Sequence, residues 1–178
     1  MPAGLAETIN NLLSSARYRV EGDSMAPALN HGDQVLAARI RRSYQRGDVV
    51  VFQQPFQSHD VYIKRIIGLP QEEIVMDGGT VHINGGVLPE KYLPESCLTC
   101  GPLEVPGDRA GDQVKKTAGL WITDPGEYFV MGDQRDNSQD SRSFGPVKES
   151  LMLGRVWLRY WPLGAWGMMD IIPGGGQT

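Results

Sequence analysis

Three short segments of the chain hold residue types that can together hydrolyse a peptide bond. The first is the turn-like segment 22–27, in which a glycine and a proline flank Ser24 and can present its hydroxyl and backbone amide outward. Serine is also common in turns that do no chemistry, so Ser24 alone does not establish catalysis. A serine nucleophile needs a nearby base that takes the proton of its hydroxyl.

Lys64 is the candidate for that base. The three histidines of the chain stand in a turn, a polar loop and a strand, without the surroundings of a catalytic base. A lysine can replace histidine when it is neutral, and burial against apolar neighbours such as Ile63 and Ile66 lowers the lysine pKa from about 10.4. The alternative is that Lys64 points into water and titrates as an ordinary amine.

The third segment, residues 132–142, follows the apolar residues 128–131 and is rich in polar side chains. A solvated acidic loop is one interpretation of this composition. Carboxylates and guanidinium groups are interleaved, however, so they can form a hydrogen-bonded platform in which Arg142 clamps Asp140 through paired hydrogen bonds.

Strands are the elements that must position these residues. Ser24 is expected in a turn between two strands, and Lys64 on a strand. An Asn-Gly pair at residues 84–85 predicts a tight hairpin. We expect a mainly β fold of coiled antiparallel sheets or a partial barrel, with a short N-terminal helix. Runs rich in apolar residues predict strands at 18–21, 34–40, 48–53, 60–67, 81–88 (the hairpin), 128–131 and 151–161.

The predicted organisation is one main domain with an appendage. Residues 1–16 are expected to form an N-terminal helical segment, residues 17–170 the main domain, and residues 171–178 a flexible tail. Between Pro89 and Pro125 the composition shifts to Pro, Gly and charged residues, which predicts a smaller, loop-rich β insertion at about 71–126.

Composition limits the partners. A net charge of −4 offers no basic field for a nucleic acid. Cys97 and Cys100 form a CxxC pair, but a zinc site needs two more ligands and the histidines lack paired spacing, so no metal or cofactor is expected. A local disulfide and two free thiols both remain open. No stretch reaches the run of about 18 apolar residues that spans a membrane.

The content, order and separation of these segments resemble the type I signal peptidases. The family's nucleophile motif Ser-Met-x-Pro-Thr corresponds to residues 24–28, with Ala28 in place of threonine. Its lysine motif corresponds to residues 62–70, and its polar motif to residues 132–142 with Gln134 in place of asparagine. Residues 46–52 and 159–162 also match, so the resemblance covers most of the chain.

The resemblance implies the signal-peptidase fold and a serine endopeptidase with a Ser/Lys dyad. Ser24 would attack the scissile carbonyl after neutral Lys64 takes its proton, and Ser138 would orient Lys64. Asp140 and Arg142 would brace the site as an ion pair, and the backbone N–H of Ser24 would donate to the oxyanion.

Two positions depart from the pattern found in some or most family members. Some members complete the oxyanion hole with a second serine where this chain has Gly22, so the second donor is not identified. Ala28 lacks the hydroxyl of the usual threonine, which would affect the efficiency of catalysis more than the family assignment.

The same resemblance implies the substrate and its surroundings. Val20, Leu29, Tyr62 and Ile63 would line shallow pockets for the small side chains of an Ala-x-Ala signal, and the preprotein would bind extended along strand edges. The catalytic domain would lie on the extracytoplasmic face of a membrane. Family members carry N-terminal membrane helices that this sequence lacks, so the anchor is expected to be either trimmed or naturally absent.

A lipid surface is a further expected partner. Indole rings are favoured at the membrane interface, and several tryptophan, tyrosine and methionine residues lie near the C-terminus. Core positions are an equally good interpretation for two of them, Trp157 and Trp161. The complete candidate set is Trp157, Tyr160, Trp161, Trp166, Met168 and Met169.

Two other functions compete with this interpretation. A self-cleaving repressor-type protease also uses a Ser/Lys dyad, but it normally carries a helical DNA-binding domain for which this chain has no room. A non-enzymatic, extracytoplasmic β-rich binding module would leave Lys64 an ordinary surface amine. The polar segment 132–142 argues against such a module.

Overall fold

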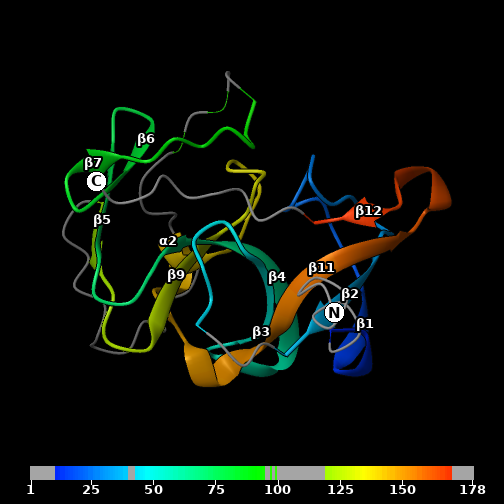
Figure 1. Ribbon diagram of the computed structural model, residues 1–178. Helices are drawn as coiled ribbons and strands as arrows, with labels where there is room; N and C mark the ends of the chain where they lie inside the picture. Colours follow the sequence, from blue (N-terminus) through cyan, green and yellow to red (C-terminus); the bar gives the residue numbers. More distant parts are fainter. Residues whose placement is uncertain (1–10, 40–42, 95–96, 98, 100–118, 170–178) are drawn as a thin grey trace, which may run out of the picture.

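The computed structural model describes residues 11–39, 43–94, 97, 99 and 119–169. Antiparallel strands dominate these residues, which confirms the predicted mainly β fold (Figure 1). The elements are β1 (Ser15–Arg19), β2 (Gln34–Ala38), β3 (Val49–Gln54), β4 (Gln57–Gly68), β5 (Glu73–Asp77), β6 (Thr80–Ile83), β7 (Gly86–Val87), β8 (Leu120–Ile122), β9 (Glu127–Met131), α2 (Ser141–Phe144), β10 (Val147–Lys148), η1 (Glu149–Leu151), β11 (Met152–Trp161), η2 (Leu163–Ala165) and β12 (Gly167–Met168).

The larger sheet positions both candidate dyad residues, Lys64 on β4 and Ser24 in the turn between β1 and β2. Among the described strands its order is β1-β2-β11-β3-β4-β9-β10, and β12 adds to β11. The long strand β11 pairs with β2 on one side and β3 on the other. It therefore connects the strands that flank Ser24 with the strands around Lys64. Strands β3, β4 and β11 curve strongly in Figure 1, as expected for a coiled sheet.

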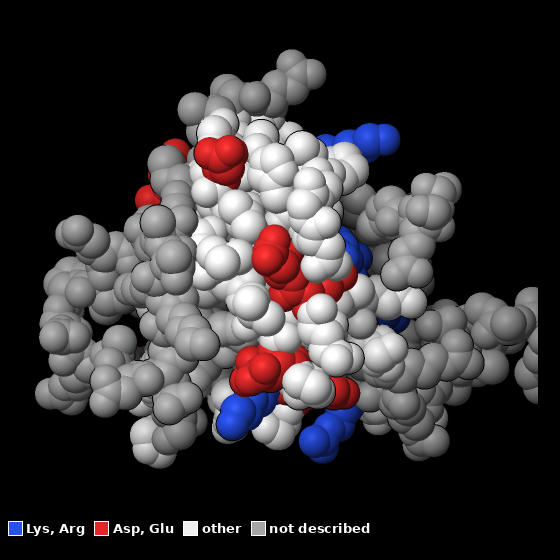
Figure 2. Space-filling view, turned by 90° about the vertical axis from the view of Figure 1, so that its left-hand side faces the viewer, with Lys and Arg blue, Asp and Glu red and all other residues white. Residues whose placement is uncertain are grey.

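The second sheet lies within the segment predicted as an insertion. Its strand order is β7-β6-β5-β8. The hairpin between β6 and β7 turns at Asn84 and Gly85, which both have positive φ as a two-residue Asn-Gly turn requires. Figure 2 looks onto this side of the molecule, where Asp and Glu side chains are spread over the described surface and Lys and Arg lie mainly near its margin.

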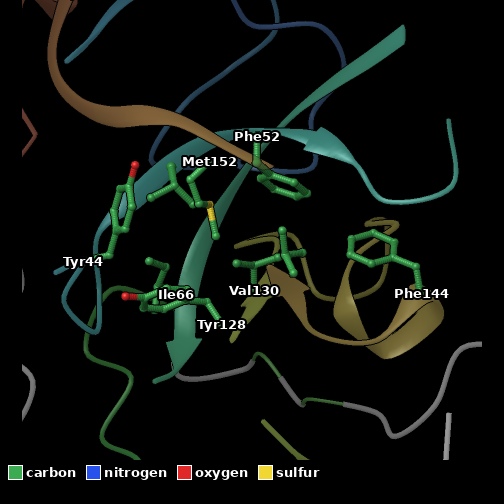
Figure 3. Close-up of a cluster of buried hydrophobic side chains, with 9 residues drawn as sticks. Tyr44, Phe52, Ile66, Tyr128, Val130, Phe144 and Met152 are labelled. Carbon is green, nitrogen blue, oxygen red and sulfur yellow. The ribbon is translucent and has the colours of Figure 1, made fainter. Parts of the chain in front are cut away.

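Three apolar clusters support these sheets. The first packs aromatic and branched side chains of β3, β4 and β9 against α2, including Phe52, Ile66 and Phe144 (Figure 3). The second lies beneath the turn that follows β1 and contains Met25, Leu29 and residues of β2, β3 and β11. The third joins the second sheet to the larger one. The site residues are therefore attached to packed strands on several sides.

The ends of the chain differ in part from the predicted elements. Residues 11–13 are helical, and the first strand begins at Ser15 rather than at Tyr18. The rest of the predicted helical segment, the tail 171–178 and much of the insertion lie outside the described residues. Cys97 is half-buried and free, and its potential partner Cys100 also lies outside the described residues.

Candidate active site

Ser24 lies in a compact turn between β1 and β2. Gly22 opens this turn with φ +77°, a conformation that favours glycine. The backbone N–H of Ala26 donates to the carbonyl of Asp23, and that of Leu29 donates to the carbonyl of Met25. Because Met25 and Leu29 are buried in the second cluster, the turn is held from below while Ser24 lines a groove above it.

Lys64 approaches Ser24 from β4. It stands opposite Val50 of β3, is 4% exposed, and its Nζ lies 2.6 Å from the Oγ of Ser24. Burial lowers the pKa of Lys64 to about 8, although the carboxylates of Asp140 and Asp133 raise it in part. A substantial fraction of Lys64 is therefore neutral near pH 8, as a general base requires.

The polar segment after β9 forms a buried platform beside the pair. The Asp140 carboxylate accepts two hydrogen bonds at 2.9 Å from the Nε and Nη2 of Arg142, and both side chains are fully buried. The same carboxylate accepts the backbone N–H of Gly132 at 3.0 Å. Ser138 is buried, and its Oγ has no hydrogen-bond partner in the described part of the chain.

A groove of about 660 Å³ runs along the nucleophile turn and β4. Of the predicted substrate-binding residues, Val20, Tyr62 and Ile63 line this groove. Leu29 is not among the lining residues, because it is fully buried in the second cluster beneath the turn. The hydroxyl of Tyr62 donates to the side chain of Gln139 at 3.1 Å, which connects β4 to the polar platform.

Several contacts at the site have no local signal in the sequence. Arg65 follows Lys64 on the strand and points to the opposite face, yet it is also buried, with Nε and Nη2 donating to Asp133 at 2.8 and 2.6 Å. The backbone N–H of Gln134 donates to the carbonyl of Ser24 at 3.0 Å. A Lys-Arg pair on a strand suggests that one side chain is exposed, and only the packing of both faces reveals otherwise.

The described residues hold no group of three or more side chains arranged to bind a metal ion. Among those residues, no helix is both long and apolar enough to cross a bilayer. Trp157 belongs to the core, and its Nε1 donates to the Oγ of Ser15 at 2.8 Å. Trp161 is instead half exposed, and Trp166 and Met168 are more exposed still.

Comparison with known proteins places this architecture in one family. The family described as signal peptidase, peptidase S26 matches residues 2–161. A probable signal peptidase I-2 from Synechocystis is 34% identical over 93% of this chain and 71% of its own length. Signal peptidase I V from Bacillus subtilis strain 168 is 36% identical over 78% of this chain and 82% of its own.

A solved structure of a signal peptidase I from Enterococcus faecalis V583 is 30% identical to this chain. It aligns with 64% of this chain and 97% of its own, with a TM-score of 0.48. The family match spans the turn that carries Ser24, the strand that carries Lys64 and the whole polar segment between residues 132 and 142. This chain belongs to the signal peptidase family, peptidase S26.

Proposed function

We propose that this signal peptidase removes N-terminal signal peptides from secreted preproteins after Ala-x-Ala, with Ser24 as nucleophile and Lys64 as general base. The observation that carries the dyad assignment is the 2.6 Å separation of Lys64 Nζ and Ser24 Oγ, combined with the burial that lowers the pKa of Lys64 to about 8. Both properties are needed before a lysine can remove a proton from a serine near neutral pH.

The reaction is acyl transfer in two steps. Neutral Lys64 takes the proton of the Ser24 hydroxyl while Oγ attacks the scissile carbonyl, and the protonated amine then gives its proton to the leaving amine. Water, activated by the same Lys64 amine, hydrolyses the acyl-enzyme. The backbone N–H of Ser24 donates to the oxyanion in both steps.

The platform after β9 holds the base and the nucleophile in register. Ser138 offers its unpartnered, buried hydroxyl as the group that orients Lys64. The ion pair of Asp140 and Arg142 braces the segment, because its hydrogen bonds end on the backbone of Gly132 and of residue 142 itself.

The groove is suited to an extended peptide. Between Val61 and Ile63, β4 pairs with β3 on one side, whereas its pairing with β9 is confined to Arg65–Gly68. Among the described strands this leaves backbone groups of β4 open toward the groove, where a substrate strand can add. Val20, Tyr62 and Ile63 then limit the substrate side chains to small ones, and Leu29 packs in the second cluster with Val20 and Ile63.

Cleavage of a preprotein with an Ala-x-Ala site tests the function. We expect one cut directly after the second alanine, located by mass spectrometry of both products. Phenylalanine in place of that alanine is expected to reduce cleavage by about 100-fold or more, because a shallow pocket cannot hold the ring. Equal cleavage of both substrates would contradict the proposed pocket, and no cleavage of either would contradict the function.

The enzyme is further proposed to work at a membrane surface with its catalytic domain on the extracytoplasmic side. Trp161, Leu163, Trp166 and Met168 are exposed around the end of β11, a composition typical of an interfacial contact. The protein is expected to float with phosphatidylcholine vesicles in a density gradient. Charged substitution of Trp166 should leave it in the dense fraction, and flotation unaffected by this change would contradict the contact.

A further inference from the structure

Gly132 is where the nucleophile turn meets the polar platform. A Cβ atom at this position would lie 2.2 Å from Ser138 Oγ and 2.5 Å from the Ser24 carbonyl oxygen, so there is no room for any side chain. The backbone of Gly132 thus touches both serines assigned to the site. A displacement of this one residue would move Ser24 and Ser138 relative to Lys64.

Two ion pairs hold the two peptide groups of Gly132. Its N–H donates to Asp140, the partner of Arg142. Its carbonyl accepts the Nε of Arg135 at 3.0 Å, and Arg135 is 1% exposed. The first ion pair lies within the segment 132–142 itself. The second depends on an anion from elsewhere in the chain.

Glu90 supplies that anion. It lies beyond β7, in the segment that leaves the second sheet, and its carboxylate binds the guanidinium of Arg135 through both oxygens, with Nη1 to Oε2 at 2.9 Å. Tyr92 and Thr99 of the same segment also contact this guanidinium through their side-chain oxygens. The Tyr92 ring additionally lies 4.3 Å from the guanidinium carbon of Arg65. The segment that follows the second sheet therefore contacts the site through two buried guanidinium groups, those of Arg135 and Arg65.

We propose that Glu90 is a positioning residue for the cleavage reaction. It orients Arg135 so that Nε points at the Gly132 carbonyl, and Gly132 in turn keeps Ser24 Oγ within reach of Lys64. The planar guanidinium makes this possible, because it presents one edge to the carboxylate and keeps Nε for the carbonyl. The inference rests on the proposed dyad and assigns the second sheet a part in catalysis.

Glu90→Gln tests this role because it removes the charge and keeps the shape. We expect kcat for an Ala-x-Ala peptide to fall by about 30-fold, since small displacements at a reacting pair are costly. KM should stay within about twofold, since Glu90 is not among the residues that line the groove. Arg135→Lys should lower kcat similarly, because one ammonium group lacks the fork that binds Glu90 and Gly132 together.

Glu72→Gln is the matched control. Glu72 binds Arg46 through both oxygens, at 2.6 and 2.9 Å, is partly buried like Glu90, and does not line the groove. Both glutamine variants are expected to lower the melting temperature, but Glu72→Gln should change kcat by less than about twofold when assayed well below that temperature. Unchanged kcat in Glu90→Gln, or equal losses in both variants, would overturn the proposal.

A second readout separates this inference from the proposed function. Acylation of Ser24 by a small activated ester, followed by intact mass, requires the dyad but no signal peptide. Glu90→Gln is expected to slow this acylation by about the same factor as kcat, and Glu72→Gln is not. If the parent protein is acylated but cuts no preprotein, the substrate assignment fails while the Glu90 proposal is still decided by the acylation rates.

Discussion

Replacing Ser24 with alanine is expected to lower preprotein cleavage by at least about 1000-fold, because the acyl-enzyme can no longer form. The fold should survive this change. Ser24 is only half-buried. Its turn is held by the buried side chains of Met25 and Leu29 and by the hydrogen bond from the Gln134 N–H to the Ser24 carbonyl. None of these contacts involves the Ser24 hydroxyl. Initial rates with a preprotein substrate, and thermal melting of both proteins, measure the two parts of this prediction.

Ser150→Ala serves as the control for loss of a serine hydroxyl. Ser150 is exposed on η1 and does not line the groove, so this variant should cleave at the parent rate. Cleavage by Ser24→Ala at more than about a tenth of the parent rate would remove Ser24 from the role of nucleophile.

Activity is expected to rise with pH through the pKa of Lys64. Only the neutral amine can accept the Ser24 proton, so kcat/KM should increase about tenfold per pH unit below about pH 8 and level off above it. A profile that is flat from about pH 6 to pH 9 would show that no group titrating near 8 controls the reaction.

The second large effect is that removing Lys64 should abolish activity but increase the stability of the fold. In the folded protein the pKa of Lys64 falls from 10.5 to about 8, so the unfolded chain binds more protons between these values. The free energy of unfolding therefore rises with pH between about 8 and 10.5. Below about pH 8 the folded protein bears the full cost of burying the protonated amine. The difference between these two pKa values corresponds to about 3 kcal/mol.

Lys64→Met is thus expected to be inactive and more stable than the parent. At pH 7 the gain should be about 2 kcal/mol, because the lost hydrogen bond to Ser24 offsets about 1 kcal/mol. The gain should disappear above pH 10.5, where Lys64 is neutral in both states. Urea unfolding at both pH values measures this, with exposed Lys148→Met as the control; a less stable Lys64→Met at pH 7 would contradict the buried, destabilised amine.

Much of the fold and part of the site could be predicted from local patterns. Branched and aromatic runs identify most strands, and the Asn84-Gly85 pair identifies the hairpin between β6 and β7, because backbone conformation there depends on nearest neighbours. The spacing of Ser24, Lys64 and the segment 132–142 is enough to suggest the family. The family match over residues 2–161 confirms that suggestion.

Burial and pairing could not be predicted in the same way. The pKa of Lys64 depends on removal of its amine from water by elements far away in the chain, and its neighbour Arg65 is buried on the opposite face of the same strand. Motif position predicts Leu29 in a substrate pocket, whereas packing places it in the core with Val20 and Met25.

Residue type and short-range periodicity are enough to predict the chemical groups, their order along the chain and most of the strands that position them. Which buried charges meet depends on how the whole chain packs. The pairing of Glu90 with Arg135 joins residues 45 positions apart, one in the segment after β7 and one in the segment after β9, beside the backbone of Gly132. Such pairs leave no local pattern, because hydrogen-bond partners and desolvation are set by whatever the whole chain packs around them.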